Sequence, residues 1–436
     1  MTKLLVRGAH IVTMDPALGD MARADILVED GAIAAIGPAL DAAYAEVIDG
    51  ADKIALPGII DAHNCLWQTV LRGYVPDLWP GQYFTHLLPL RERFLAEDNY
   101  NATCIGGVEM LSYGTTTVVD YCHNVGGPGF ADASIKGLRE SGIRHVFTYS
   151  FMKSRPMDFA TREERFADAQ RVYDTFHDPN SLTTLNFGVD SVGSPDILAQ
   201  LEFSRRLRAN SCIHIHTAGQ IAELHSMGLL GPDFMAIHAN MTTNDELDQM
   251  AAAGSPICFT PTADVQGTPA DVVRRAKLRG VEVVFGCDIP CSIASDTMGQ
   301  LRIIYNVQSF LDGAIERSFN TLATRRPTVG PNMPLLKPRT LLEIATITTA
   351  RVLGMDGKIG SLTPGKRADI LLVNKGPFGD SIADDACAHV ILQTSPRDVD
   401  TVIVDGKMRM SRGVLKDFDP KRAKALMAES RSRIFR

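Results

Sequence analysis

The sequence lacks any apolar run of the roughly 18 residues that a membrane-spanning helix requires. It also lacks a run of lysine or arginine, and its formal net charge is −7 with a pI of about 5.9. These absences argue against nucleic acid and anionic membranes as partners. The opening residues, MTKLLVRGAHIVTMD, have no apolar core or small-residue cleavage site, so we expect no signal peptide.

Paired cysteines are absent as well. The eight cysteines are scattered along the chain, and none belongs to a CxxC pair. In a chain of 436 residues this pattern is typical of reduced thiols, not of a disulfide framework. We therefore expect a cytoplasmic protein. Because 45% of the residues are hydrophobic, the chain can bury a large core.

The two ends of the chain are rich in predicted strands. The segments LLVRGAHIVT and ILVEDGAIAAIG near the start, and RADILLVN and TVIVDGKM near the end, are dominated by β-branched and aliphatic residues. Asp30-Gly31 and Asp405-Gly406 are hairpin signals, because glycine accepts the positive φ of a tight primed turn. We predict one small β-sandwich domain built from residues 1–55 and 360–436.

The long middle of the chain alternates short apolar strands with amphipathic helices. Eight strands are expected to end near His63, Asp120, Ser150, Asp190, His216, His238, Thr260 and Cys287. Helices are expected over residues 97–113, 195–208, 244–253, 269–279 and 297–311, and a final one over 341–355 after a proline-rich loop at 325–340. Eight such units predict a (β/α)8 barrel over residues 56–359. A doubly wound open sheet is the alternative, but no GxGxxG motif supports it.

Four polar residues stand at predicted strand ends: His63, His216, His238 and Asp288. In a (β/α)8 barrel these ends face one mouth, where the pocket lies. Imidazoles and a carboxylate that converge there suit Zn²⁺ or Fe²⁺, with a position left open for water. Simpler interpretations exist, with the histidines as hydrogen-bonded core residues and Asp288 as a helix cap. The spacing alone leaves both interpretations open. His214 is expected lower in the barrel, in a structural role.

Seven segments carry a resemblance to a known family. They are PGIIDAH (residues 57–63), LRGYVPDLW, GVEMLSYGTTTVVDY, IHIHTAG, AIHANMT, FGCDIPCS and GKIGSLTPGKRADILLV. In this order they resemble the amidohydrolase superfamily, and within it the branch of the S-adenosylhomocysteine/methylthioadenosine deaminases, guanine deaminase and the triazine hydrolases (chlorohydrolases). The resemblance covers nearly the whole chain. It is specific for the fold and the superfamily, and only weakly specific for the substrate.

The resemblance implies a role for each of the four residues. His63 and His216 would be metal ligands, and His238 would polarise the substrate or steady the attacking water. Asp288 would bind the metal and take the proton from its water. The implied cofactor is one divalent metal, Zn²⁺ or Fe²⁺. The implied chemistry is attack of hydroxide on an sp² carbon, with loss of a nitrogen or halide group.

The sequence departs from the family pattern at three positions. The family has a second histidine where Cys65 stands, on the same strand face as the first; a thiolate there would bind zinc, although a barrel-wall cysteine is usually an apolar filler. The deaminases carry a proton-shuttling glutamate where Gly219 stands, and this branch often has histidine where Phe259 stands. A different pocket is therefore expected, and its candidate residues are Trp67, Gly219, Phe259 and Cys291.

Three functions remain open at this point. The first is a divergent amidohydrolase that uses metal-activated water to hydrolyse a non-peptide C–N bond, or a bond to a similar leaving group, in a small cyclic or aromatic substrate. The second is a metal-free barrel enzyme that performs elimination, isomerisation or cyclisation with His63, His238 and Asp288 as acid and base. The third is an inactive homologue that binds a small molecule or a protein partner. A homo-oligomer is an open alternative to a monomer, because the family is often oligomeric.

Overall fold

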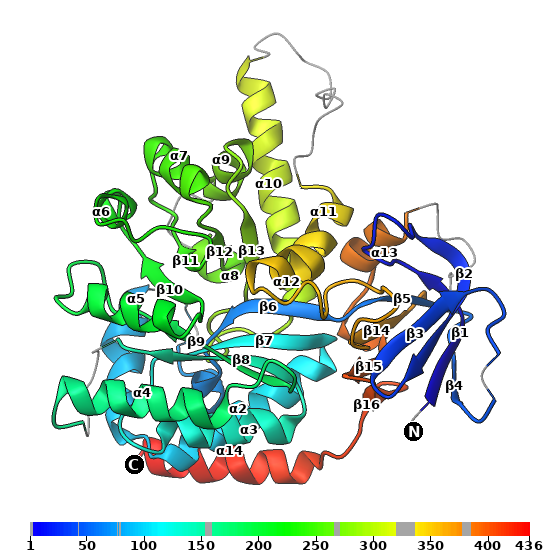
Figure 1. Cartoon of the computed structure of the whole chain (residues 1–436), viewed down its shortest axis with the longest axis horizontal. Coiled ribbons are helices and arrows are strands. Elements are labelled where there is room, and N and C mark those ends of the chain that lie inside the picture. The colour runs from blue at the N-terminus through cyan, green and yellow to red at the C-terminus, as the bar shows by residue number, and fades with distance from the viewer. Residues whose placement is uncertain are drawn as a thin grey trace.

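A nearly closed barrel of eight parallel strands forms the centre of the molecule. Figure 1 shows its strands among the helices, with a second sheet at one side. The computed structural model describes residues 3–41, 43–75, 77, 80–152, 159–265, 271–319, 336–376 and 385–436. The barrel strands follow one another in chain order: β6 (Ile59–Asn64), β7 (Thr115–Cys122), β8 (Arg144–Ser150), β9 (Thr183–Gly188), β10 (Ser211–Ile215), β11 (Phe234–His238), β12 (Ile257–Phe259) and β13 (Val283–Phe285). Every residue of β6, β7 and β8 is buried, as expected for parallel strands covered on both faces.

The barrel closes between its first and last strands just beyond β13. Asn64 and Asp288 form a parallel bridge there. The backbone N–H of Asp288 donates to the carbonyl oxygen of His63 over 3.0 Å, and the N–H of Cys65 donates to that of Asp288 over 2.8 Å. The predicted (β/α)8 barrel is therefore confirmed, and the doubly wound alternative is wrong because these bonds join the two outer strands.

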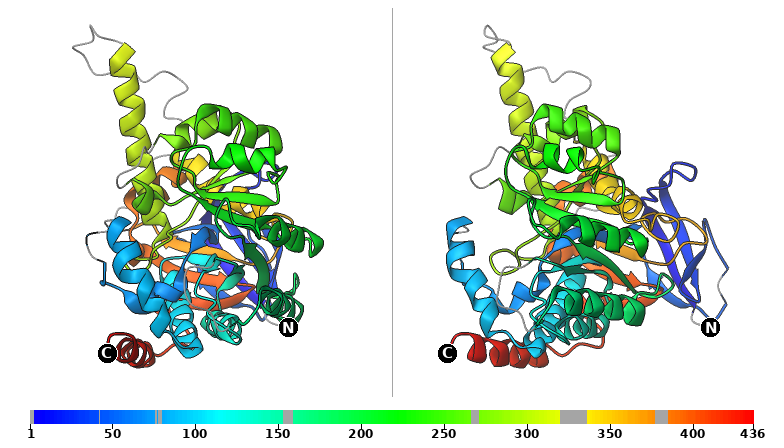
Figure 2. Two further views of the ribbon diagram at one scale, coloured as in Figure 1. Left: turned by 90° about the vertical axis from the view of Figure 1, so that its left-hand side faces the viewer. Right: turned by 60° about the vertical axis from the view of Figure 1, so that its left-hand side comes forward.

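Helices surround the barrel, as both views in Figure 2 show. The longer ones are α2 (Ala96–Ser112), α3 (Phe130–Ser141), α4 (Arg162–Phe176), α5 (Ile197–Arg206), α6 (Gln220–Ser226), α7 (Asn244–Ala253), α9 (Val272–Leu278) and α10 (Thr297–Phe319). Short helical segments are α1 (Pro80–Gln82), η1 (Leu66–Leu71), η2 (Tyr83–Leu87), η3 (Leu88–Arg93), α8 (Pro261–Asp264), α11 (Pro338–Glu343), η4 (Ile344–Thr348) and α12 (Thr349–Val352).

Two helices differ from the sequence prediction in length. The helix α10 continues to Phe319, beyond the expected end at residue 311, and extends away from the body of the molecule (Figure 2). No proline interrupts it before that point. The helix α11 begins at Pro338, inside the expected loop, because proline suits the first position of a helix. Most of the predicted loop, up to residue 335, lies outside the described residues.

None of the helices in the described part of the chain has the length and hydropathy that a membrane-spanning helix requires.

Both ends of the chain contribute to a second, mixed sheet of nine strands with its own apolar core. Strand β5 pairs antiparallel with β14, with Pro57 opposite Ile370, and so joins the two ends. Asp30, Gly31, Asp405 and Gly406 all have positive φ, as the predicted hairpin turns require. The strands are β1 (Lys3–Ile11), β2 (Met21–Glu29), β3 (Ala32–Gly37), β4 (Glu46–Asp49), β5 (Lys53–Pro57), β14 (Ile370–Asn374), β15 (Val399–Val404), β16 (Lys407–Ser411) and β17 (Val414–Leu415).

The last helix, α14 (Pro420–Ile434), packs on the barrel and not on the second sheet (Figure 1). Asn101 of α2 donates to Ser430 Oγ over 3.1 Å, and Arg433 forms an ion pair with Asp98 at the start of α2. This helix falls within residues 360–436, the range predicted for the sheet domain. The helix α13 (Ala386–Gln393) likewise contacts α10 and α11 of the barrel layer.

Candidate active site

A cavity of about 230 Å³ opens at the mouth of the barrel, where the carboxyl ends of the strands converge. Its apolar lining includes Phe84, Leu88, Met152, Ile215 and Ile289. Its polar lining comes mostly from strand ends and the loops that follow them, and consists of Cys65, Tyr83, His123, His214, His216, His238, Asn240, Asp264, Asp288 and Ser292.

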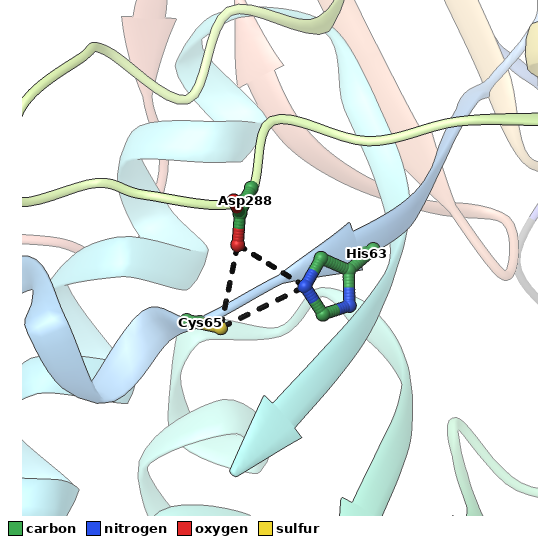
Figure 3. Close-up of side chains that lie close together, drawn as sticks. All are labelled: His63, Cys65 and Asp288. Carbon is green, nitrogen blue, oxygen red and sulfur yellow. Dashed lines mark hydrogen bonds and ion pairs between the residues drawn. The ribbon is translucent and has the colours of Figure 1, made fainter. Parts of the chain in front are cut away.

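Three buried side chains beside this cavity bring a nitrogen, a sulfur and an oxygen together (Figure 3). His63 Nε2 lies 3.1 Å from Asp288 Oδ1 and 3.8 Å from Cys65 Sγ. Cys65 Sγ lies 3.7 Å from Asp288 Oδ1. Among the described residues, this is the group of His, Cys, Asp and Glu whose possible ligand atoms all lie within 4.8 Å of one another.

Hydrogen bonds to the buried carboxyl group of Asp61 hold the backbone around this cluster. Its Oδ1 accepts the N–H of His63 over 3.1 Å, and its Oδ2 accepts the N–H of Cys287 and the hydroxyl of Thr297, each also over 3.1 Å. Burial raises the pKa of Asp61 to about 6. One carboxyl group therefore connects the first and last barrel strands directly under the cluster, which holds His63 in register with Asp288.

Asp288 and His238 both adopt a left-handed backbone, each with φ of 69°. Residues other than glycine seldom adopt this conformation, and such strained positions concentrate at functional sites. Burial would raise the pKa of Asp288, but the hydrogen bond and charge of His63, together with His238 and His123, bring it down to about 2. Asp288 is therefore a carboxylate at neutral pH.

His238 is paired with a second carboxylate. Its Nδ1 lies 2.9 Å from Asp264 Oδ1, and Asn240 donates to the same oxygen over 2.9 Å. Burial lowers the pKa of His238, but the charge and hydrogen bond of Asp264 outweigh it and raise this pKa to about 9. The imidazole of His238 is thus cationic at neutral pH, and it lines the cavity.

The two histidines of β10 and its end lie at different depths in the barrel. His216 is exposed at the rim, where its ring lies 5.3 Å from that of His238, and it does not belong to the His63 cluster. His214 lines the cavity, with its ring 5.1 Å from that of His63. Of the two histidines, His214 is therefore the one whose ring contacts the cluster.

None of the four predicted pocket residues lines the cavity. Trp67 is fully buried because the chain after Cys65 turns into η1, and its ring packs edge-on against His123 at 5.1 Å. Phe259 is fully buried against Phe285, at 6.4 Å between ring centres.

The other two predicted pocket residues serve local structure. Gly219 has φ of 91° and precedes α6, where its N–H donates to Glu246 Oε1 over 2.9 Å. Cys291 is buried, with Sγ 3.1 Å from Gln68 Oε1. The deaminase pattern has a carboxyl group at position 219, and Gly219 provides none.

Five polar residues of the cavity were not identified from the sequence: Tyr83, His123, Asn240, Asp264 and Ser292. His123 directly follows β7, which continues two residues past its predicted end at Asp120. A longer strand prediction would have placed His123 at a strand end. Tyr83 and Asp264 lie on short helical segments after predicted strands and carry no periodic signal.

The donor set of the cluster fits a divalent cation. An imidazole, a thiol and a carboxyl group are the three ligand types that zinc binds most often, and three protein ligands suffice at a catalytic zinc site. Without a cation, burial and the charges of Asp288 and Asp120 raise the pKa of the Cys65 thiol well above its ordinary value. The residues present therefore provide a ligand set for a metal, with Cys65 in the place of an imidazole.

Comparisons with known proteins agree with this fold. The sequence pattern of the Amidohydrolase family matches residues 54–409. Among relatives, a 5'-deoxyadenosine deaminase of Methanosarcina mazei is 25% identical, covering 94% of this chain and 93% of its own. A 5-methylthioadenosine/S-adenosylhomocysteine deaminase of Symbiobacterium thermophilum is 28% identical, with the same shares covered.

Solved structures give the same fold. An adenosine deaminase from Xanthomonas campestris with bound zinc has a TM-score of 0.83 and 22% identity, covering 100% of this chain and 99% of its own. An atrazine chlorohydrolase variant from Arthrobacter aurescens, complexed with zinc and atraton, has a TM-score of 0.82 and 23% identity, covering 99% and 100%.

Proposed function

Because the chain belongs to the amidohydrolase family, we propose that it hydrolyses a non-peptide C–N bond, or a bond to a similar leaving group, in a small cyclic or aromatic substrate. The relatives named above are deaminases, and one solved structure with the same fold is an atrazine chlorohydrolase. The observation that carries the proposal is the convergence of His63, Cys65 and Asp288 beside the cavity. We further propose a cytoplasmic location.

In this proposal His63, Cys65 and Asp288 would hold one divalent cation, zinc or iron. When bound, such a cation lowers the pKa of a coordinated water to about 7 and so makes hydroxide available near neutral pH. Two solved structures with the same fold contain zinc, which supports zinc as the cation. His216, proposed as a further ligand from the sequence, stands at the rim in the structure.

The chain's own residues supply the proton transfers. Asp288 is ionised at neutral pH, so an Oδ atom can accept a proton from the attacking water. His238 carries a proton on each ring nitrogen when cationic; Nδ1–H is held by Asp264, which leaves Nε2–H to donate to the substrate or its leaving group. The side chains of Phe84, Leu88 and Met152 present apolar surface to a ring.

Elemental analysis combined with a product screen tests the proposal. Untagged protein, purified without added metal, is analysed for zinc and iron and then offered ring-bearing amines and halides, with release of ammonia or halide as the readout. We expect metal in the protein and release from at least one substrate class. Protein that stays metal-free after incubation with Zn²⁺ would overturn the hydrolase proposal and favour metal-free acid–base chemistry by His63, His238 and Asp288.

A further inference from the structure

Four side chains next to the cluster form a chain of hydrogen bonds that ends at the sulfur of Cys65. Cys291 Sγ lies 3.1 Å from Gln68 Oε1, and Gln68 Nε2 lies 2.9 Å from Tyr83 Oη. Tyr83 Oη lies 3.1 Å from His123 Nε2, and His123 Nδ1 lies 3.7 Å from Cys65 Sγ. We infer that His123 donates its Nδ1–H to this sulfur and so orients Cys65 as a ligand of the cation.

The first two contacts in this chain run in one direction. The amide oxygen of Gln68 can only accept, so the thiol of Cys291 is the donor. Burial raises the pKa of Cys291 to about 12, which keeps its proton in place. With the amide oxygen on Cys291, the amide nitrogen faces Tyr83. Because an amide nitrogen only donates, Tyr83 Oη accepts at this contact.

The third contact sets the tautomer of His123. Tyr83 Oη already accepts from Gln68, and its own proton is directed at His123 Nε2, its other hydrogen-bond partner. A nitrogen that accepts this proton carries none of its own, so the ring proton of neutral His123 sits on Nδ1. Nδ1 is the atom that faces Cys65 Sγ. The chain of donors thus ends with an N–H that faces the sulfur, and the backbone of Tyr121 is a further hydrogen-bond partner of this ring.

The ring of His123 is held in this orientation from two further sides. Trp67 packs edge-on against it, with the two ring planes at 89°. Arg91, which is fully buried, donates from Nη1 to the carbonyl oxygen of His123 over 3.0 Å.

His123 acts as a positioning residue in this arrangement and not as a ligand, because it falls outside the group whose donor atoms lie within 4.8 Å. Outer hydrogen-bond partners of this kind orient metal ligands, and their loss typically costs about 10–100-fold in metal affinity. The inference rests on the proposed function, since it presupposes a cation at the cluster.

Cobalt substitution of the full-length protein tests the inference without a substrate. Thiolate bound to Co²⁺ gives a sulfur-to-metal charge-transfer band in the near ultraviolet, and Co²⁺ affinity is measured by competition with a chelator. We compare wild type with His123→Leu, which removes the donor, and with His123→Asn, whose amide nitrogen can replace Nδ1–H. Tyr83→Phe removes one oxygen and leaves His123 free to place its proton on Nε2. Cys65→Ser serves as the control without the sulfur.

The possible results distinguish failure of the inference from failure of the proposed function. We expect His123→Leu to keep the band, move it to longer wavelength, and bind Co²⁺ about 10–100-fold more weakly, with His123→Asn close to wild type. Unchanged band and affinity in both His123→Leu and Tyr83→Phe would overturn the inference and leave the function standing. Bound Co²⁺ without a band in wild type would overturn the inference, because Cys65 would not be a ligand. No Co²⁺ binding at all would overturn the proposed function as well. If His123→Leu does not fold, the band and the Co²⁺ affinity of Tyr83→Phe alone test the inference: a changed band or affinity supports it, and unchanged values overturn it.

Discussion

His63 Nε2 and Asp288 Oδ1 lie 3.1 Å apart, although 225 residues separate them in the sequence. The two side chains come from the first barrel strand and the loop after the last one. A backbone hydrogen bond also joins the two residues at the closure of the barrel, where the N–H of Asp288 donates to the carbonyl oxygen of His63. The geometry of the site is therefore part of the geometry of barrel closure.

Replacing Asp288 with asparagine should abolish turnover while the fold persists. We expect kcat to fall by about 10²–10⁴, because Asn cannot accept the proton of the attacking water. The backbone bonds to His63 and Cys65 remain, and asparagine tolerates the positive φ of this position. The measurements are steady-state rates on a substrate from the screen and a thermal melt. Asp248→Asn, at an exposed side chain, is the matched control. Wild-type rates in Asp288→Asn would contradict both the hydrolytic and the acid–base mechanism.

The purified protein should contain about one zinc or iron per chain, and Cys65→Ala should retain it less well. Binding should release a proton, because the Cys65 thiol has a raised pKa without the cation and coordinates as a thiolate. Affinity should accordingly increase with pH. Elemental analysis and proton release into weakly buffered solution are the measurements. Cys212→Ala removes an equally buried thiol outside the cluster and should keep the wild-type metal content.

Adenosine-type and guanine-type bases should be deaminated slowly. Such reactions need a proton delivered to a ring nitrogen, and position 219 carries no carboxyl group for this step. General acid help of this kind is worth about 10²–10⁴ in rate. An ammonia-release assay over purines, pterins and pyrimidines measures the effect. Fast release from any of them would show that another group, with His238 as the first candidate, delivers the proton.

The His238–Asp264 pair should make stability depend on pH. The pKa of His238 is raised to about 9 in the folded protein, against an ordinary value near 6.5. The stabilisation is therefore fully present below pH 6.5 and is lost as pH rises through about 9. We expect wild type to lose thermal stability over this interval and Asp264→Asn to lose less. Parallel pH profiles of the two variants would refute this assignment.

The sequence predicted most of the barrel because its signals are periodic. Strand ends at His63, His238 and near Cys287 follow from apolar runs, and the hairpin turns at Asp30 and Asp405 follow from the glycine beside each. The placement of Cys65 beside His63 followed from strand alternation, and the structure places them together. The roles of these residues remain predictions until they are tested.

The support of the site could not be predicted in the same way. After Cys65 the chain leaves the strand for η1, so alternation no longer places Trp67. Asp264 and Tyr83 reach the cavity from short helical segments, where neither period applies. Their roles depend on contacts between distant segments, such as that between Tyr83 and His123. Such contacts become visible only in three dimensions.

The composite sheet cannot be completed until the end of the chain has been synthesised. Strand β5 leaves the ribosome early, but the β14 strand that pairs with it follows roughly 300 residues later. At about 5–20 residues per second, that edge waits for about 15–60 seconds without its partner. An unpaired strand edge is a site for wrong pairing between chains. Lys53, which faces Asn374 in the finished sheet, puts a charge on this edge. The nascent chain is therefore most exposed to aggregation at its beginning, and holdase chaperones would be expected to bind there first.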